Sequence, residues 1–309
     1  VKRGIREAGG MATEFNVLAP CDGQGSGNEG FKYVLPSRDL IAASVEMMIE
    51  HAGYDAAVMI GTCDKIVPGM IMGAMRVNIP TIFASGGPMK AGKTKDGKVV
   101  DLISVFEGVA EHKQGKISDE ELEELECKGC PSQGSCSGMF TANSMNCLCE
   151  ALGFALPGNG TVLAVDPARK TLYRKAATRI VEMALQGGPL PTQIVTQESM
   201  DNAFILDMAM GGSTNTVLHA LSIAREAGVD YDLARINEIS ARCPNICKVS
   251  PSSSYHIEDV DRAGGVSAIL KEISSIKGLL NGDCITVTGK TLRQNISRKK
   301  VLDAGVIHP

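Results

Sequence analysis

Short apolar runs alternate with amphipathic segments in the first third of the chain, and this alternation constrains the fold more than any other feature. Residues 54–61 (YDAAVMIG) and 79–87 (IPTIFASGG) have the length and composition of buried strands. Residues 37–53 and 69–77 have apolar residues at helical spacing. Strands and helices in alternation form βαβ units whose parallel sheet is covered on both faces. The pattern therefore predicts an α/β fold, a layered αβα domain with a largely parallel sheet.

The rest of the chain is expected to be mainly helical, with helices over 101–115, 118–129, 138–158, 168–187, 196–211 and 211–228. Ser37 is expected to cap the first long helix, and Ser118 with Glu121 has the spacing of a capping box. The Lys- and Gly-rich stretch 90–100 predicts a surface loop. Past residue 280, CITVTGKTLRQNI predicts a new strand.

Composition disfavours several classes of function. The longest apolar runs are far shorter than the roughly 20 residues of a membrane span. A net charge of −4, no Trp and 4% aromatic residues disfavour a nucleic-acid partner. Ten cysteines without a signal sequence predict a reducing compartment, the cytoplasm. The first residues have the character of a helix interior, so we expect a segment upstream of Val1.

A thiol, a carboxylate and an amine stand side by side at Cys63, Asp64 and Lys65, directly after the first predicted strand. Ligands of doubly wound sheets bind beyond the carboxyl ends of the strands. A turn at this point would direct the three side chains toward one site. The residues alone leave open a surface turn with a buried thiol.

A second group of thiols lies in the stretch CKGCPSQGSC, where Cys127-x-x-Cys130 is followed by Cys136. The loop precedes a predicted helix, whose amino terminus would stabilise thiolates, as in a soft-metal loop. A zinc ribbon would need a second pair, and only CPNIC (243–247), with three intervening residues, is available. We interpret Cys127 as a thiol that is not a ligand.

Residues 18–30, LAPCDGQGSGNEG, add the carboxylate of Asp22 and satisfy G-x-G-x-x-G formally. A dinucleotide site needs these glycines to open a helix directly. Pro36 intervenes before the helix expected at Ser37, so we favour a flexible loop over an active site.

Four blocks of the sequence together resemble the dihydroxy-acid dehydratase family. CDKIVPGMIMG (63–73) fits the family signature Cys-Asp-Lys-x-x-Pro-Gly-x-x-x-Gly/Ala. The other blocks are MRVNIPTIFASGGPM (75–89), GSCSGMFTANSMNCLCEALGFALPGNGT (134–161) and DMAMGGSTNTVLHAL (207–221). The resemblance covers essentially the whole chain. GMF and TANSMNC are more similar to the branched-chain enzymes than to the sugar-acid dehydratases.

The resemblance implies an iron–sulfur cluster, [4Fe–4S] or [2Fe–2S], with Cys63 and Cys136 as two of its three thiolate ligands. It also implies Mg²⁺ bound by Asp22, Asp64 and Lys65, the last as a carbamate, N6-carboxylysine. A salt bridge between Lys65 and Asp64 is the alternative. Six further residues are expected either to contact the substrate or to act only in helix capping and packing: Thr141, Asn143, Ser144, Ser213, Thr214 and Asn215.

The chain departs from the family pattern at both ends. The family's first cluster cysteine would lie upstream of Val1, and we do not assign that role to Cys21. The carboxyl-terminal β-barrel domain, with its Glu ligand and Ser base, is absent. We therefore expect residues 1–280 to form the amino-terminal domain, which binds the cluster and Mg²⁺. Residues 281–309 are expected to end it and lead into the missing domain.

The implied activity is loss of water from a 2,3-dihydroxy carboxylate, such as 2,3-dihydroxyisovalerate, to give a 2-keto acid in valine and isoleucine biosynthesis. A homodimer is also implied, and the chain alone is expected to be inactive because it lacks the base. The alternatives are a sugar-acid or 6-phosphogluconate dehydratase of the same family, a nicotinamide-dependent dehydrogenase, and a zinc or iron–sulfur electron carrier.

Overall fold

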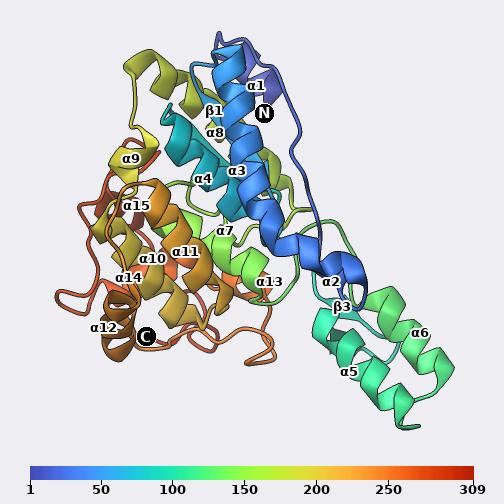
Figure 1. The fold of residues 1–309 in the computed structure, drawn as a ribbon. Helices are drawn as coiled ribbons and strands as arrows, with labels where there is room; N and C mark the ends of the chain where they lie inside the picture. Colours follow the sequence, from blue (N-terminus) through green and yellow to red (C-terminus); the bar gives the residue numbers. More distant parts are fainter.

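Helices dominate the computed structural model, which describes residues 1–309 (Figure 1). The helices of the first half are α1 (Lys2–Glu7), α2 (Asp22–Gly25), the 3₁₀ helix η1 (Glu29–Tyr33), α3 (Val34–Ala52), α4 (Ile66–Val77), α5 (Leu102–Lys113), α6 (Asp119–Lys128) and α7 (Thr141–Ala151). Those of the second half are α8 (Pro167–Gln186), α9 (Pro191–Ile194), α10 (Gln197–Met210), α11 (Asn215–Glu226), α12 (Leu233–Arg242), α13 (Ile257–Arg262), α14 (Gly265–Ile273) and α15 (Leu292–Ile296). The strands are β1 (Ala57–Gly61), β2 (Thr81–Ser85), β3 (Gly92–Lys93) and β4 (Val99–Val100).

The predicted βαβ unit is confirmed. β1 and β2 pair in parallel, in register from Ala57 opposite Thr81 to Gly61 opposite Ser85, and α4 is the crossover between them. Ala155 adds one parallel bridge to Phe83 of β2. The fold is α/β as predicted, but its parallel sheet is small and most of the core is built from helices.

Helices α3 and α4 pack closely because two glycines of α4 face α3. A Cβ atom at Gly69 would lie 2.7 Å from the carbonyl oxygen of Arg38, and one at Gly73 would lie 2.7 Å from Cβ of Val45. Real Cβ atoms do not approach this closely, so both positions require glycine. The close approach places the start of α3 beside the turn that joins β1 to α4.

The predicted start of α3 and the predicted end of α7 are wrong. α3 begins at Val34, and Ser37 lies inside it, where its hydroxyl donates to the Val34 carbonyl at 2.6 Å instead of capping. Pro36 is therefore accommodated in the first helical turn, which needs no amide hydrogen there. α7 ends at Ala151, before Gly153, whose φ of +86° turns the chain toward the sheet.

The strand predicted past residue 280 is also wrong. Ile285 and Thr291 form a single isolated bridge, and α15 follows. Threonine hydroxyls in this stretch bind neighbouring backbone and side chains, as where Thr286 donates to the Lys290 carbonyl at 2.8 Å. Such local bonds favour turns over a strand.

Two other local predictions have different outcomes. The Ser118–Glu121 capping box at α6 is confirmed. The expected surface loop at 90–100 instead contains the short antiparallel hairpin of β3 and β4.

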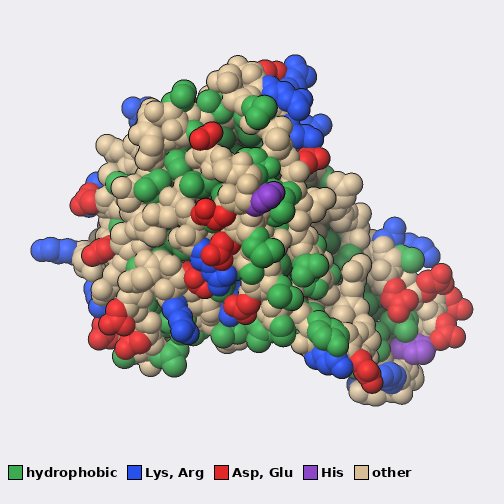
Figure 2. All heavy atoms as spheres, turned by 45° about the horizontal axis from the view of Figure 1, so that its top comes forward, with side chains coloured by type: hydrophobic (Ala, Val, Ile, Leu, Met, Phe, Trp, Pro, Cys, Tyr) green, Lys and Arg blue, Asp and Glu red, His purple; other side chains and the backbone are tan.

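Helices α5 and α6 form an arm that projects from the rest of the molecule (Figure 1). Figure 2 shows acidic side chains gathered on this α5–α6 arm, whose residues Asp119, Glu120 and Glu121 lie in the first turn of α6.

Every residue of α7 is buried, and α7, α10 and α14 line the helical part of the core. The final segment joins this core, since Val287, Leu292, Ile296 and Ile307 are all buried. The domain boundary expected at residue 280 stays a prediction.

None of the helices combines the length and the apolar character needed to cross a membrane.

Candidate active site

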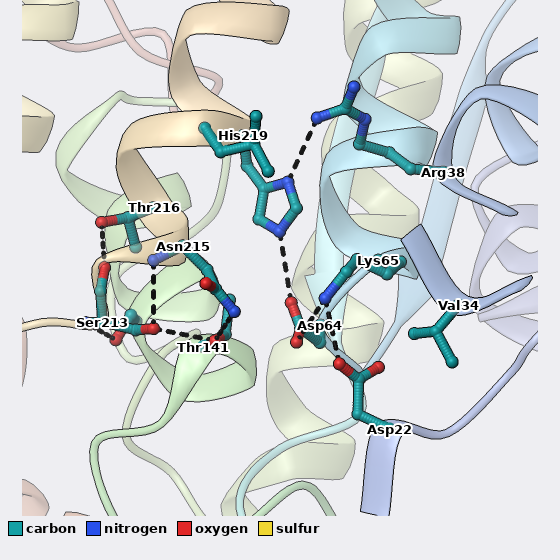
Figure 3. Close-up of polar contacts among 12 residues, drawn as sticks. Asp22, Val34, Arg38, Asp64, Lys65, Thr141, Ser213, Asn215, Thr216 and His219 are labelled. Atoms are coloured by element: carbon teal, nitrogen blue, oxygen red, sulfur yellow. Dashed lines mark hydrogen bonds and ion pairs between the residues drawn. The ribbon is translucent and has the colours of Figure 1, made fainter. Parts of the chain in front are cut away.

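The turn between β1 and α4 carries Cys63, Asp64 and Lys65, at the carboxyl end of the strand as expected. Lys65 Nζ lies 2.7 Å from Oδ2 of Asp64 and 3.0 Å from Oδ2 of Asp22, the first residue of α2 (Figure 3). Asp64 and Lys65 are only 7% and 5% exposed. Two carboxylates more than 40 residues apart thus converge on one amine in a largely dry site.

The two carboxylates have opposite pKa shifts. Burial opposes ionisation of Asp64, but the hydrogen bond from His219, the neighbouring Asp22 and the hydrogen bond from Lys65 together outweigh it and lower its pKa to about 2. Burial and the neighbouring Asp64 carboxylate raise the pKa of Asp22. The arrangement therefore keeps Asp64 ionised and makes Asp22 the more weakly acidic member of the pair.

One oxygen of this pair has no partner. Oδ1 of Asp22 is buried without any hydrogen bond, which is costly for a carboxylate unless a donor or cation binds it. Carboxylate oxygens are the ligands that Mg²⁺ prefers. The donor set thus fits a hard cation, although within residues 1–309 no three His, Cys, Asp or Glu side chains form a complete ligand group.

Unmodified Lys65 forms the ion pair with Asp64 that the sequence left as an alternative. The same amine also bridges to Asp22. Its position between two acidic groups is where a carbamate would present oxygen to the same cation. The carbamate itself stays a prediction.

His219 and Arg38 complete the Asp64 environment, and sequence reasoning missed both. Nε2 of His219 lies 3.2 Å from Oδ1 of Asp64, and Nδ1 of His219 lies 3.4 Å from Nη1 of Arg38 (Figure 3). His219 is fully buried. Its only sequence signal was its place in the block DMAMGGSTNTVLHAL, four residues after Asn215 and so on the same side of a helix.

Cys136 lies close enough to Cys63 for the charge of one thiolate to act on the other, although the two are 73 positions apart in the sequence. Burial, followed by the charge of the Cys63 thiolate, raises the pKa of Cys136 to about 12. Burial and the neighbouring Cys21 raise the pKa of Cys63 to about 11. Thiolate is the form that binds metal, so any metal centre held here would have to offset this burial. The structure thus brings Asp22, Asp64 and the two thiols into one region.

Asn143 holds the loop that carries Cys136. Its side-chain amide donates to the carbonyls of Cys136 and Gly138, the latter at 2.7 Å, and accepts from the Ser135 hydroxyl at 2.7 Å. Asn143 is completely buried, so we assign it to support of the loop. The hydroxyl of Ser137, next to Cys136, is buried without a partner.

The remaining expected polar residues form a second cluster at the start of α11. The hydroxyls of Thr141 and Ser213 lie 2.8 Å apart, the Asn215 amide donates to Thr141 at 3.0 Å, and the Ser213 amide donates to the Ser144 hydroxyl at 3.0 Å. Thr214 is exposed, and its side chain does not cap the helix. Because α11 also carries His219, this cluster is tied to the Asp64 side by one rigid helix.

The glycine motif and the further cysteines, on which the alternative functions depend, do not form the sites that those functions need. Gly25 ends α2, and η1 leads into α3, so no strand precedes the glycines as a dinucleotide site requires. Cys247 is fully buried, and the Cys243 thiol donates to the carbonyl of Ile205. Cys127 and Cys130 are exposed.

Comparison with known proteins shows which family this chain resembles. The family model for the amino-terminal part of dihydroxy-acid/6-phosphogluconate dehydratases matches residues 1–295. A dihydroxy-acid dehydratase of Akkermansia muciniphila is 60% identical over 309 residues, which are 100% of this chain and 55% of that protein. The chain thus spans about half the length of the curated relative it matches.

Proposed function

This chain belongs to the dihydroxy-acid/6-phosphogluconate dehydratase family, and we propose that the protein containing it is a dihydroxy-acid dehydratase, a lyase. The proposed reaction removes water from a 2,3-dihydroxy carboxylate such as 2,3-dihydroxyisovalerate and yields a 2-keto acid for valine and isoleucine biosynthesis. The observation that carries the proposal is the convergence of Asp22 and Asp64 on Lys65, beside Cys63. The 60% identical dihydroxy-acid dehydratase favours this substrate class over 6-phosphogluconate or another sugar acid.

Two cofactors are part of the proposal. Asp22, Asp64 and carboxylated Lys65 would hold Mg²⁺, and Cys63 and Cys136 would hold an iron–sulfur cluster through two of its three thiolates. When bound, these centres supply Lewis acidity, the soft one toward a leaving hydroxyl and the hard one toward a carboxylate and its neighbouring hydroxyl. The residue types support this assignment of the two centres, because thiolates select soft metals and carboxylates select hard ones.

The protein's own groups prepare this site. The hydrogen bonds from His219 and Lys65 keep Asp64 ionised despite its burial. Asn143 holds the Cys136 loop in place through its amide. The hydroxyl of Thr141 and the amide of Asn215 would supply donors and acceptors for substrate hydroxyls. The proton acceptor is proposed to lie in the carboxyl-terminal half, and the protein is proposed to be a homodimer, as the family resemblance implies. A cytoplasmic location is proposed because all ten cysteines here are free thiols, which a reducing compartment preserves.

The cofactor assignment is tested in the full-length protein, purified without oxygen. Cys63→Ser and Cys136→Ser are each expected to lower bound iron and sulfide to background, because each removes a thiolate ligand. Asp64→Asn is expected to keep the cluster and lose Mg²⁺-dependent keto acid formation from 2,3-dihydroxyisovalerate. Cys127→Ser is the matched control, because Cys127 is an exposed thiol in the last turn of α6, and this variant should retain iron.

Three results would contradict the proposal. Full iron content in Cys63→Ser would favour an electron carrier that uses Cys127, Cys130 and Cys136. Faster turnover of 6-phosphogluconate than of 2,3-dihydroxyisovalerate would favour the sugar-acid enzyme. Keto acid formation by the 309-residue chain alone would show that it already contains the base.

A further inference from the structure

His219 joins three segments that are distant in the sequence. It projects from α11, its Nε2 contacts Asp64 in the turn after β1, and its Nδ1 contacts Arg38 in the first turns of α3. The imidazole is 0% exposed, so water does not compete for either nitrogen. Both ring nitrogens are therefore committed to protein partners.

The two partners determine where the imidazole hydrogen lies. A guanidinium group has only donors, so Nδ1 of His219 must accept from Arg38. Nε2 then carries the hydrogen and donates it to Oδ1 of Asp64 at 3.2 Å. The ionised carboxylate at one end and the guanidinium at the other select the same tautomer.

This bond differentiates the two oxygens of Asp64. Oδ1 is occupied by His219, whereas Oδ2 faces Lys65 at 2.7 Å, and Lys65 in turn contacts Oδ2 of Asp22 at 3.0 Å. The charged groups around the imidazole are Asp64 and Lys65 on the turn and Arg38 on α3. Rotation of the Asp64 carboxylate would cost the His219 hydrogen bond inside a dry site.

We propose that His219 is a positioning residue whose Nε2–H group holds Oδ1 of Asp64, so that Oδ2 alone is presented with Asp22 to a divalent cation. Arg38 holds His219 in the tautomer that this requires. The inference rests on the proposed function, because it assigns Asp64 to the cation site. A hydrogen bond to a metal-binding side chain typically changes metal affinity by about 10- to 100-fold.

The test measures Mn²⁺, in place of Mg²⁺, by electron paramagnetic resonance in the full-length protein purified without oxygen. His219→Leu removes the donor and is expected to weaken Mn²⁺ binding by about 10- to 100-fold. His219→Gln keeps a side-chain N–H that can reach Oδ1 and is expected to stay within about threefold of wild type. Equal weakening in both variants would overturn the hydrogen-bond role.

His256 provides the matched control. It is also buried, and its Nε2 lies 3.2 Å from Oδ2 of the buried Asp101, which is not part of the proposed cation site. His256→Leu is expected to lower the melting temperature without changing Mn²⁺ affinity. If His219→Leu weakens Mn²⁺ binding no more than His256→Leu does, the role of His219 is only structural and the inference fails.

Two further variants keep the test decisive. If His219→Leu does not fold, Arg38→Met leaves Nδ1 without its donor and is expected to weaken Mn²⁺ binding several-fold; unchanged binding would overturn the tautomer assignment. If Asp64→Asn binds Mn²⁺ with the same affinity as wild type, both the proposed cation site and this inference are overturned. Asp64-dependent Mn²⁺ binding without dehydratase activity would refute the proposed reaction alone, and the His219 comparison would then still decide the inference.

Discussion

At the scale of single residues, hydrogen-bond partners decide whether a buried carboxylate is ionised. Asp64 accepts hydrogen bonds from two side chains, those of His219 and Lys65, and its pKa is lowered despite burial. Asp207 is just as poorly exposed, but its carboxylate accepts from one side-chain donor, the Thr216 hydroxyl at 2.7 Å. Burial therefore prevails over this single bond and raises the pKa of Asp207 to about 7. Identical side chains thus have opposite ionisation behaviour in one fold.

Asp207 predicts a pH dependence of stability. Folded Asp207 keeps its proton where the unfolded chain has lost it, so the free energy of unfolding should fall as pH rises from about 4 to about 7. Asp207→Asn cannot ionise and should gain stability relative to wild type across this range, by on the order of a few kcal/mol. Thermal unfolding of the two full-length proteins at pH 5 and pH 8 checks this.

Asp101→Asn is the control with the opposite sign. Burial opposes ionisation of Asp101, but hydrogen bonds from His256, Ser250 and Ser104 hold its pKa well below the usual range. The stability that ionised Asp101 contributes to the folded protein is present above about pH 4 and is lost only as pH falls further. Its stability difference from wild type should therefore be the same at pH 5 and pH 8. An Asp207→Asn difference that is equally constant would contradict the prediction.

At the scale of elements, the close packing of α3 on α4 positions the site. Gly69 and Gly73 let the two helices approach, and this places Arg38 of α3 within reach of His219. The turn with Asp64 and Lys65 begins α4, so its orientation follows that of the helix. The site geometry therefore depends on small residues that carry no chemistry themselves.

Gly73→Ala tests this packing. Alanine favours a helix by about 1 kcal/mol over glycine, but its Cβ would lie 2.7 Å from Val45 and 3.0 Å from the Ala42 carbonyl. Overpacking of a core typically costs about 1–3 kcal/mol, so we expect a net loss of stability. Urea unfolding of the full-length protein measures it.

Gly305→Ala is the comparison for this substitution. A Cβ there would meet only the side chains of Asp303, at 3.2 Å, and Tyr255, at 3.5 Å. Its stability should remain within about 0.5 kcal/mol of wild type. A Gly73→Ala protein as stable as Gly305→Ala would show that α3 can move away without cost.

At the scale of the whole molecule, the chain after residue 280 is part of the same core. Ile307 is 0% exposed and lies in the hydrophobic cluster that also contains residues of α10 and α14. The Asn202 side chain of α10 donates to the Asn281 carbonyl at 2.9 Å and accepts from its amide at 2.8 Å. These contacts favour one cooperative unit that includes the final segment.

Ile307→Ala measures the contribution of this segment. Removing a buried isoleucine side chain typically costs about 2–5 kcal/mol, and we expect a loss in this range for the full-length protein by urea unfolding. Leu302→Ala, in the same segment but 64% exposed, should cost less than about 0.5 kcal/mol. Equal, small effects would show that residues 281–309 are only a lead-in to a further domain.

Local patterns predicted the βαβ unit, the Ser118 cap and the placement of Cys63, Asp64 and Lys65 at a strand end, because periodicity and turn chemistry act over a few neighbouring residues. The same reasoning failed at Ser37, where the helix starts earlier at Val34, and at Ile285, where local threonine hydrogen bonds favour a turn and leave only a single bridge. The first failure concerns a helix boundary and the second a whole strand, and in both places hydrogen bonds of neighbouring residues decide the outcome.

The sequence by itself determined the fold class, the family and the residue types of the candidate site, since each is encoded in contiguous blocks. Only the tertiary structure decided that Asp22 and Asp64 converge on Lys65 and that buried His219 and Arg38 complete the site. The physical reason is that these contacts, apart from the one between the neighbours Asp64 and Lys65, join residues 43 to 181 positions apart. Their geometry depends on how helices pack, and no local pattern records it.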